Sequence, residues 1–203
     1  GPTWEIIQKM GDKDQARATM AAAGVPIVPG TDIINDPDEA HQKADEIGYP
    51  LLVKARSGGG GKGIRLVERS EDFLNEYALA RQEAQNAFSD DGVYLEKFLT
   101  RVKHIEIQLL CDQHQHVVAL GERECSIQRK NQKLLEESPS PSLTPEIRHA
   151  MMEVSRQAAL AIGYENAGTI EFLMDAQGHF YFMEMNTRLQ VEHPITEVVT
   201  GVD

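Results

Sequence analysis

A run of four glycines, Gly58 to Gly61, lies between two hydrophobic segments and is followed by Lys62-Gly63. Because glycine has no Cβ, the backbone N–H groups of such a run can approach a phosphate closely. Residues 64–67 are strand-like, whereas a dinucleotide-binding glycine motif opens a helix, and a P-loop requires Ser or Thr where this chain has Gly63. The run therefore predicts a flap between two strands that closes over a triphosphate; the alternative is a flexible surface hairpin.

Two carboxylates and one amide belong to a hairpin predicted over residues 167–186. A two-residue turn pairs Glu171 with Phe182, and the alternation of side chains then places Glu171, Glu184 and Asn186 on one face. Such oxygen ligands, together with phosphate oxygens, suit Mg²⁺. The alternatives are solvated side chains or a register slip of one residue, which would divide the set between two faces. The hydrophobic strands around both carboxylates favour the metal site, because a buried charge is costly without a partner.

A dense polar segment, residues 186–194, follows the second of these strands directly. Arg188 offers a planar fork for an oxyanion, and Glu192 could accept a proton. The alternative is a salt bridge within a loop. Isolated lysines complete the set, and each by itself is typical of a solvated surface residue: Lys13, Lys54, Lys97 and Lys133.

The elements that must position these residues can be read from the periodicity of the sequence and from its capping residues. Helices are predicted over 12–23, 37–47, 71–88 and 145–162, with Asp36 and Thr144 as N-caps. Strands are predicted over 51–55, 64–68, 93–99, 104–111, 116–124, 167–174 and 179–186. The fold class is therefore α+β, with mostly antiparallel sheets.

The composition excludes several classes of protein. The 203 residues carry a formal net charge of −12 without a basic stripe, so we expect no nucleic-acid partner. No run of 18 apolar residues is present, so we expect no membrane partner and a cytoplasmic location. Cys111 and Cys125 belong to the two strands of one predicted hairpin, whose turn at Gln113 and His114 places Cys111 near His116 and far from Cys125, so a disulfide is not predicted. The seven histidines show no spacing typical of zinc ligands.

A series of segments, in order along the whole chain, resembles the biotin carboxylase family of ATP-grasp enzymes. The segments are Met10-Gly-Asp-Lys13, the glycine flap, Glu96-Lys97-Phe98-Leu99, His104-Ile-Glu-Ile-Gln, Glu122-Arg-Glu-Cys125-Ser-Ile-Gln128, Gln132-Lys133, Glu184-Met-Asn186-Thr-Arg188-Leu-Gln-Val-Glu192-His-Pro and Thr200-Gly-Val-Asp203. The resemblance implies an ATP-grasp fold. Residues 1–24 would form an entry segment and helix, 25–98 a small lid domain with the flap, and 99–203 part of a larger sheet domain with the metal and bicarbonate site.

The resemblance also implies roles for individual residues. Lys13 and Lys54 would contact the ATP phosphates, Gly60 and Gly61 would cover them, Glu96, Lys97, Phe98 and Leu99 would bind adenine, and His104, Gln128, Asn131 and Glu171 would complete the nucleotide site. Glu171, Glu184 and Asn186 would hold two Mg²⁺ or Mn²⁺ ions. Lys133, Arg188, Val191 and Glu192 would surround bicarbonate, with Lys133, Arg188 and Glu192 catalytic. Asn131 is a departure, since the family usually carries histidine at that position.

The implied activity is the ADP-forming carboxylation of biotin on a carrier protein, from ATP and bicarbonate through carboxyphosphate, in fatty acid biosynthesis or a related pathway. The implied partners are a biotin carboxyl carrier protein or domain and a carboxyltransferase subunit or domain. The resemblance admits a homodimer of the full-length parent, and a mitochondrial matrix location if the source is eukaryotic.

The family also carries an α/β domain before the position of Lys13 and a C-terminal part with an arginine near biotin. Neither is in this sequence, so we expect the chain to continue in its parent and the biotin pocket to be incomplete here. Three alternatives remain open: an Mg-ATP-binding module without turnover, an inert fragment whose exposed edges bind another chain, and another ATP-grasp ligase such as carbamoyl-phosphate synthetase. The stretches 128–133 and 188–192 favour biotin.

Overall fold

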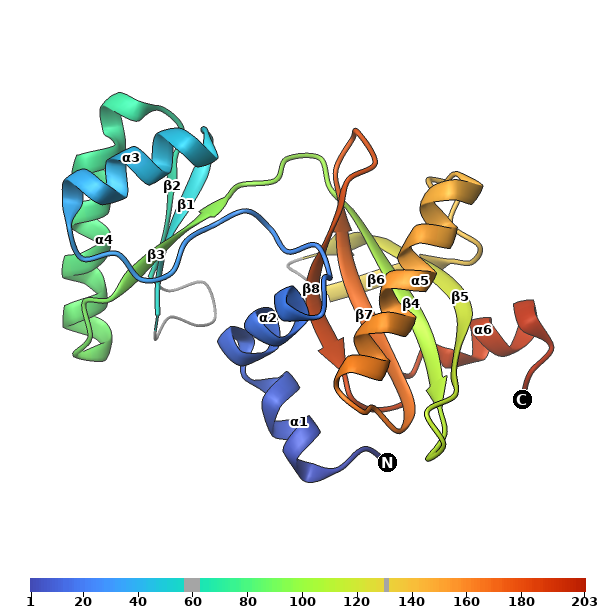
Figure 1. Cartoon of the computed structure of the whole chain (residues 1–203). Coiled ribbons are helices and arrows are strands. Elements are labelled where there is room, and N and C mark those ends of the chain that lie inside the picture. The colour runs from blue at the N-terminus through green and yellow to red at the C-terminus, as the bar shows by residue number, and fades with distance from the viewer. Residues whose placement is uncertain (57–62, 130–131) are drawn as a thin grey trace. The chain divides into compact units, whose positions relative to one another are not determined.

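The structure, a computed structural model, describes residues 1–56, 63–129 and 132–203, and for Lys13 and Asp14 it describes only the backbone (Figure 1). The chain divides into two compact units, each with its own sheet. One unit consists of Gly1–Ile27 and Arg101–Asp203, and the other of Val28–Thr100. Within the described residues, no helix is long and apolar enough to cross a membrane.

The unit of Val28–Thr100 is a three-stranded antiparallel sheet with helices packed on it. The strand order is β2-β1-β3, with β1 at Leu51–Ala55, β2 at Ile64–Val67 and β3 at Val93–Lys97. The helices are α3 (Pro37–Ile47), the short 3-10 helix η1 (Ser70–Asp72) and α4 (Phe73–Phe88). Its core includes Leu51, Val53, Phe73, Tyr77 and Leu95, all almost fully buried.

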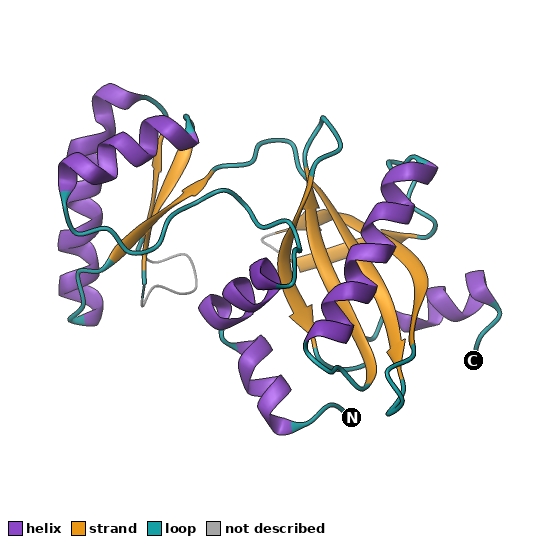
Figure 2. Cartoon of the chain, viewed as in Figure 1, coloured by secondary structure: helices purple, strands orange, loops and turns teal. Residues whose placement is uncertain are grey.

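The larger unit contains a five-stranded antiparallel sheet of order β6-β5-β4-β7-β8. The strands are β4 (Lys103–Cys111), β5 (Val117–Arg129), β6 (Gln132–Glu137), β7 (Asn166–Met174) and β8 (Phe180–Asn186). The helices are α1 (Trp4–Gly11), α2 (Lys13–Ala22), α5 (Pro145–Ala161) and α6 (His193–Thr200). Figure 2 shows helices lying across the strands of this sheet.

The two faces of the five-stranded sheet differ in chemistry, because side chains alternate along each strand. Ile105 and Ile107 of β4 and Phe172 of β7 join one buried apolar cluster with Met20 of α2 and Met151 of α5. The side chains that point to the opposite face include Glu106 and Gln108 of β4 and Glu171 of β7, which are polar. The apolar face thus supplies the core, and the polar face is left for the site.

The α+β class is confirmed, and capping explains why several helix bounds were predictable. Asp36 accepts hydrogen bonds from the backbone N–H groups of Asp38 and Glu39, and α3 then runs to Gly48, as predicted. Thr144 caps α5 in the same way through the N–H of Ile147. Three elements were not predicted: α1, β6 and α6.

The predicted register of the β7–β8 hairpin was wrong. Phe182 lies opposite Phe172, because three residues rather than two separate the bonded pair Asp175 and His179 at the turn, and Glu171 lies opposite Glu184, because an irregularity between Glu171 and Phe172 inserts Met183 into β8. The extra residue shifts the pairing and leaves both carboxylates on the polar face. Cys111 and Cys125 are both free thiols.

Candidate functional site

A row of charged side chains crosses four neighbouring strands on the polar face of the five-stranded sheet. Arg123 of β5 lies opposite Glu106 of β4, Glu106 lies opposite Glu171 of β7, and Glu171 lies opposite Glu184 of β8. Arg123, Glu106 and Glu171 are buried. Buried charges of this kind require partners of opposite sign and satisfied hydrogen bonds.

Lys133 of β6 supplies positive charge to the middle of this row. Its Nζ donates to Glu106 Oε2 at 2.6 Å and to Glu171 Oε1 at 2.9 Å, and lies 3.8 Å from Glu192 Oε1. Burial by itself would lower the pKa of Lys133, but the hydrogen bonds and Coulombic attraction of Glu106 and Glu171 outweigh burial and raise it above its ordinary value. Lys133 is therefore a fixed cation at neutral pH, suited to bind an anion rather than to act as a base.

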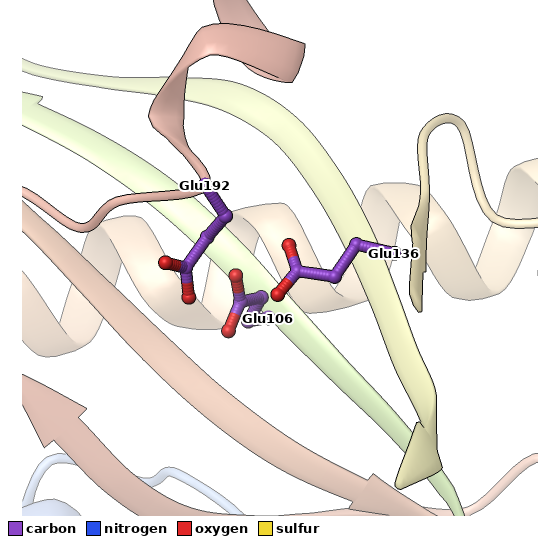
Figure 3. A group of neighbouring side chains, drawn as sticks. All are labelled: Glu106, Glu136 and Glu192. Carbon is purple, nitrogen blue, oxygen red and sulfur yellow. The ribbon is translucent and has the colours of Figure 1, made fainter. Parts of the chain in front are cut away.

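Three carboxyl groups converge beside this ammonium group. Glu106, Glu136 of β6 and Glu192 each place one oxygen within 4.8 Å of the others, and Figure 3 shows the three side chains pointing toward one another. Burial, followed by repulsion from Glu106 and Glu192, raises the pKa of Glu136 to about 7. Glu136 thus holds a proton over part of the neutral range, which relieves the repulsion within the cluster.

Glu106, Glu136 and Glu192 are not the ligand set predicted from sequence. That set, Glu171, Glu184 and Asn186, lies on β7 and β8, at the other end of the same row: Glu171 lies opposite Glu184, and Asn186 Nδ2 donates to Glu171 Oε1 at 2.7 Å. Two carboxylates and an amide on adjacent strands form an oxygen donor set that suits Mg²⁺. The predicted residues therefore fit a magnesium ion chemically, and Lys133 links the two groups through Glu171.

His104 and Gln128 lie at the edge of the same polar face. Gln128 Nε2 donates to His104 Nδ1 at 3.0 Å, and His104 Nδ1 lies 3.9 Å from Glu171 Oε2. Burial lowers the pKa of His104 against the attraction of Glu171, so the ring is neutral at pH 7. The structure thus brings His104, Gln128, Glu171 and Lys133 together, although β4, β5, β6 and β7 supply one each.

Lys54 of β1 and the Glu96–Leu99 segment, which were predicted to bind the nucleotide, belong to the unit of Val28–Thr100. Lys54 Nζ donates to Glu96 Oε1 at 2.9 Å and lies 5.6 Å from the centre of the Tyr94 ring. Lys97 donates to the carbonyl oxygens of Gly48 and Tyr49 at 2.9 and 3.1 Å, which fixes the approach to β1. The side chain of Lys97 therefore has a structural role in this unit.

Three of the predicted bicarbonate residues, Arg188, Val191 and Glu192, lie in the segment between β8 and α6. Arg188 is exposed, and its Nη1 donates to the carbonyl oxygen of Leu189 at 3.2 Å. Val191 is 93% exposed, whereas Glu192 is turned toward Lys133. Gly60, Gly61 and Asn131 lie outside the described residues, as does the side chain of Lys13.

The predictions from sequence assigned no role to Glu106, Glu136, Arg123 or Gln190, all of which contribute to the charged face or support it. Glu106 had a detectable signal, because His104, Glu106 and Gln108 are polar residues at alternate positions of a hydrophobic strand. The sequence gives no such signal for Arg123, because an arginine between two acidic residues is typical of a solvated ion pair. Its partners in the structure are far away in the sequence.

Comparison with known proteins supports a single family. The family described as carbamoyl-phosphate synthase L chain, ATP binding domain, matches residues 12–203. The chain is 55% identical over 205 residues to biotin carboxylase 1 of Bacillus subtilis and covers 46% of that protein. It is 54% identical over 204 residues to biotin carboxylase 1, chloroplastic, of Populus trichocarpa and covers 39% of it.

A solved structure extends the similarity to three dimensions. The biotin carboxylase domain dimer of Hydrogenobacter thermophilus 2-oxoglutarate carboxylase, determined with MgADP, ADP and bicarbonate, matches with a TM-score of 0.81 and 51% identity. The match covers 100% of this chain and 45% of that one, so the chain spans less than half the length of these relatives. The chain belongs to the family of the carbamoyl-phosphate synthase L chain ATP-binding domain, has the ATP-grasp fold, and corresponds to an ATP-binding portion of biotin carboxylases.

Proposed function

We propose that this chain is the Mg-ATP- and bicarbonate-binding core of a ligase that carboxylates biotin on a carrier protein. The observation that carries the proposal is the position of Lys133, whose ammonium group is held by Glu106 and Glu171 and lies 3.8 Å from the carboxylate of Glu192. A fixed cation beside a carboxylate can bind an oxyanion and remove its proton. The similarity to biotin carboxylases over the whole chain supports this assignment.

Bicarbonate is a weak nucleophile, and its target, the γ-phosphorus of ATP, carries negatively charged oxygens. Glu192 would accept the bicarbonate proton, and the freed oxygen would attack the γ-phosphorus and displace ADP, forming carboxyphosphate. Lys133 would hold the anion, and Arg188 would stabilise the negative charge that develops. Cleavage of the C–O bond of carboxyphosphate would release CO₂ and phosphate. The phosphate would take the ureido proton of biotin, and the ureido nitrogen would attack CO₂.

Glu171, Glu184 and Asn186 are the residues that would hold Mg²⁺, or Mn²⁺ in its place. A divalent cation at this position neutralises charge on the phosphate oxygens of the nucleotide. Asn186 already donates to Glu171 at 2.7 Å, so the carboxylate is held in position by the protein. Lys133, which binds the same carboxylate, would link the metal residues to the bicarbonate residues.

The residues proposed to bind ATP are distributed over the two units. Lys54 and the Glu96–Leu99 segment belong to Val28–Thr100, which we propose as the lid domain, and His104 and Gln128 belong to the unit that we propose as part of the large domain. Paired with Glu96, Lys54 would exchange a carboxylate for phosphate oxygens when the nucleotide binds. Lys13, Gly60, Gly61 and Asn131 are proposed by resemblance alone.

Bicarbonate-dependent phosphate release from Mg-ATP, measured with and without free biotin, tests the proposal. We expect the wild-type chain to bind Mg-ATP in calorimetry and Glu192→Gln to bind it equally well. We also expect Glu192→Gln to lose the bicarbonate-dependent release, because an amide cannot accept the proton. Glu197→Gln, in α6, is the matched control. Unchanged turnover in Glu192→Gln would contradict its role as the base.

A second candidate is an Mg-ATP-binding module without turnover. It is favoured by one observation: the chain covers only 39% and 46% of the two biotin carboxylases compared above. Mg-ATP binding without any bicarbonate-dependent phosphate release would select it. A biotin carrier, a carboxyltransferase, a homodimer of the parent and a cytoplasmic location remain part of the first proposal and follow from the similarity to biotin carboxylases.

A further inference from the structure

Arg123 of β5 is the largest fully buried side chain among the described residues, and it is fixed to the sheet from one side. Its Nε donates to Glu106 Oε1 at 2.5 Å, and its Nη1 donates to Gln108 Oε1 at 2.9 Å. Both acceptors belong to β4. A guanidinium group carries five donors in a rigid plane, and these two contacts set the orientation of that plane.

Nη2 also donates to Thr169 Oγ1 of β7 at 3.4 Å, and two further donors of the same guanidinium group reach the segment around Glu192. Nη2 donates to Gln190 Oε1 at 2.9 Å, and Nη1 donates to Thr196 Oγ1 at 2.8 Å. Both acceptors are buried. Gln190 precedes Glu192 by two residues and Thr196 follows it by four, so the two hydrogen bonds hold the segment on either side of Glu192.

Local forces provide little order for this segment. The helix α6 has only eight residues, and Glu192, its N-cap, makes no side-chain capping hydrogen bond. A helix this short is marginal without tertiary contacts. The position of Glu192 therefore depends on contacts from elsewhere, and hydrogen bonds to the charged, buried Arg123 are among the strongest that neutral side chains can accept.

We infer that Arg123 is a positioning residue that anchors residues 190–196 to the sheet and thereby holds the Glu192 carboxylate beside Lys133. The inference rests on the proposed role of Glu192 as the base, and it adds a residue that acts on the reaction only through another. Arg123 also pairs with Glu106, the partner of Lys133, so one side chain orients both the acidic and the cationic side of the bicarbonate site. Lysine could not replace it, because the donors of an ammonium group share one nitrogen, whereas the acceptors around Arg123 are reached by three separate nitrogens of the planar guanidinium group.

Hydrogen exchange of the full chain tests the anchor without any need for turnover. Thr196→Val and Gln190→Met each remove one acceptor while keeping the volume of the side chain. Thr200→Val is the matched control, because Thr200 lies in the same helix and bonds to the carbonyl oxygen of Thr196. We expect amides of residues 190–196 to exchange roughly 10-fold faster in both test variants. In both test variants, the amides of β4 and β7 should exchange at the wild-type rate. In Thr200→Val, all amides should exchange at the wild-type rate.

Unchanged exchange at residues 190–196 in both test variants would overturn the inference, as would a uniform increase over the whole sheet, which would indicate a general loss of stability. If Arg123→Lys folds, its amides at residues 190–196 should exchange as fast as those of the test variants. If it does not fold, the exchange rates of Thr196→Val decide whether Arg123 is the anchor.

Kinetics then separate this inference from the proposed function. If the wild-type chain releases phosphate in a bicarbonate-dependent way, we expect Thr196→Val to raise the KM for bicarbonate several-fold while leaving the Kd for Mg-ATP unchanged. A purely structural role for Arg123 would leave that KM unchanged, and such a result would overturn the inference. If the wild-type chain shows no such release, the proposed activity of this chain fails, and the exchange rates at 190–196 alone decide whether Arg123 is the anchor.

Discussion

Lys133 is the residue on which the charged face depends. Three carboxylates, Glu106, Glu171 and Glu192, lie within 4 Å of its Nζ, and Glu106 and Glu171 are buried. Carboxylates this close repel one another strongly in a medium less polar than water. One ammonium group shared by all three lowers the cost of burying them. An anionic substrate that binds at Lys133 must therefore compete with the carboxylates of the protein itself.

The first prediction concerns Lys133→Gln. Loss of the ammonium group leaves the buried carboxylate of Glu171 without its lysine partner, although Glu106 keeps Arg123, so we expect the free energy of unfolding to fall by ~2 kcal/mol, less than for a fully buried pair because Lys133 remains partly exposed. Bicarbonate-dependent phosphate release should also be lost. Urea denaturation at pH 7 measures the first effect. Lys43→Gln, which breaks the exposed pair with Glu46, is the control and should change stability by less than ~0.5 kcal/mol. Equal effects of the two variants would contradict the central position of Lys133.

The second prediction concerns Glu136, whose pKa is raised to about 7 in the folded chain, chiefly by burial. Between its ordinary pKa of 4.5 and about 7, the unfolded chain loses this proton while the folded chain keeps it. Glu136 therefore favours the folded state fully below pH 4.5, and this contribution declines up to about pH 7 and is then lost. Glu136→Gln should remove this decline. Between about pH 5 and pH 8, its free energy of unfolding should therefore rise relative to that of the wild type, by up to ~3 kcal/mol.

Urea denaturation of Glu136→Gln at several pH values measures this difference. Glu137→Gln is the matched control, since Glu137 is the next residue of β6 and is exposed. If the two variants show the same pH profile, the carboxyl group of Glu136 does not titrate near neutrality.

At the scale of elements, α3 shows how one side chain defines a helix start. Asp36 accepts from the N–H groups of Asp38 and Glu39 at 2.9 and 2.8 Å, and Pro37 occupies the first helical position. The third prediction is that Asp36→Ala lowers the free energy of unfolding of this unit by ~1 kcal/mol. Thermal denaturation followed by circular dichroism measures the effect. Asp32→Ala, an exposed aspartate before the helix, is the control. If Asp36→Ala and Asp32→Ala lower the stability equally, the stabilisation by Asp36 comes from its negative charge rather than from capping.

Elements with strong local signals could be predicted from sequence, and the others depended on tertiary contacts. The helices α3 and α5 begin with a cap and a proline, so their starts follow from local chemistry. The strand β6 has no such signal, because most of its residues are exposed and its pairing partner β5 supplies the hydrogen bonds that define it. The irregularity in β8 is likewise a property of the pairing with β7.

The same distinction applies to the site. Glu171 and Asn186 could be placed together because a hairpin relates them, and the structure joins them by a hydrogen bond. Their closeness to Lys133 is a tertiary feature, because Lys133 of β6 reaches Glu171 at 2.9 Å across the two strands that separate them in the order β6-β5-β4-β7-β8. Neither spacing nor periodicity encodes that order. Arg123 was missed for the same reason, since its contacts join β4, β5 and α6.

At the scale of the whole molecule, each unit has a separate hydrophobic core. Among the described residues, the core of Val28–Thr100 includes Phe73 and Leu95 but no residue of the five-stranded sheet, and its three strands form ladders only with one another. Two isolated bridges, Gly30 with Glu96 and Ile34 with Val93, attach the segment before α3 to β3 within the same unit. A region with its own core and complete strand pairing has what independent folding requires.

The fourth prediction is that residues 28–100 fold when produced alone, because sheet, helices and core are all contained in that range. We expect a cooperative thermal transition in circular dichroism and a helical spectrum. Leu95→Ala in this piece should lower the free energy of unfolding by ~3 kcal/mol, since Leu95 is fully buried. The change should abolish the thermal transition or sharply lower its midpoint temperature. Leu74→Ala, on the exposed side of α4, should leave the transition nearly unchanged. A piece without a cooperative transition would show that this unit depends on the rest of the chain. A folded piece would allow the contribution of Lys54 to nucleotide binding to be measured apart from Lys133 and Glu192.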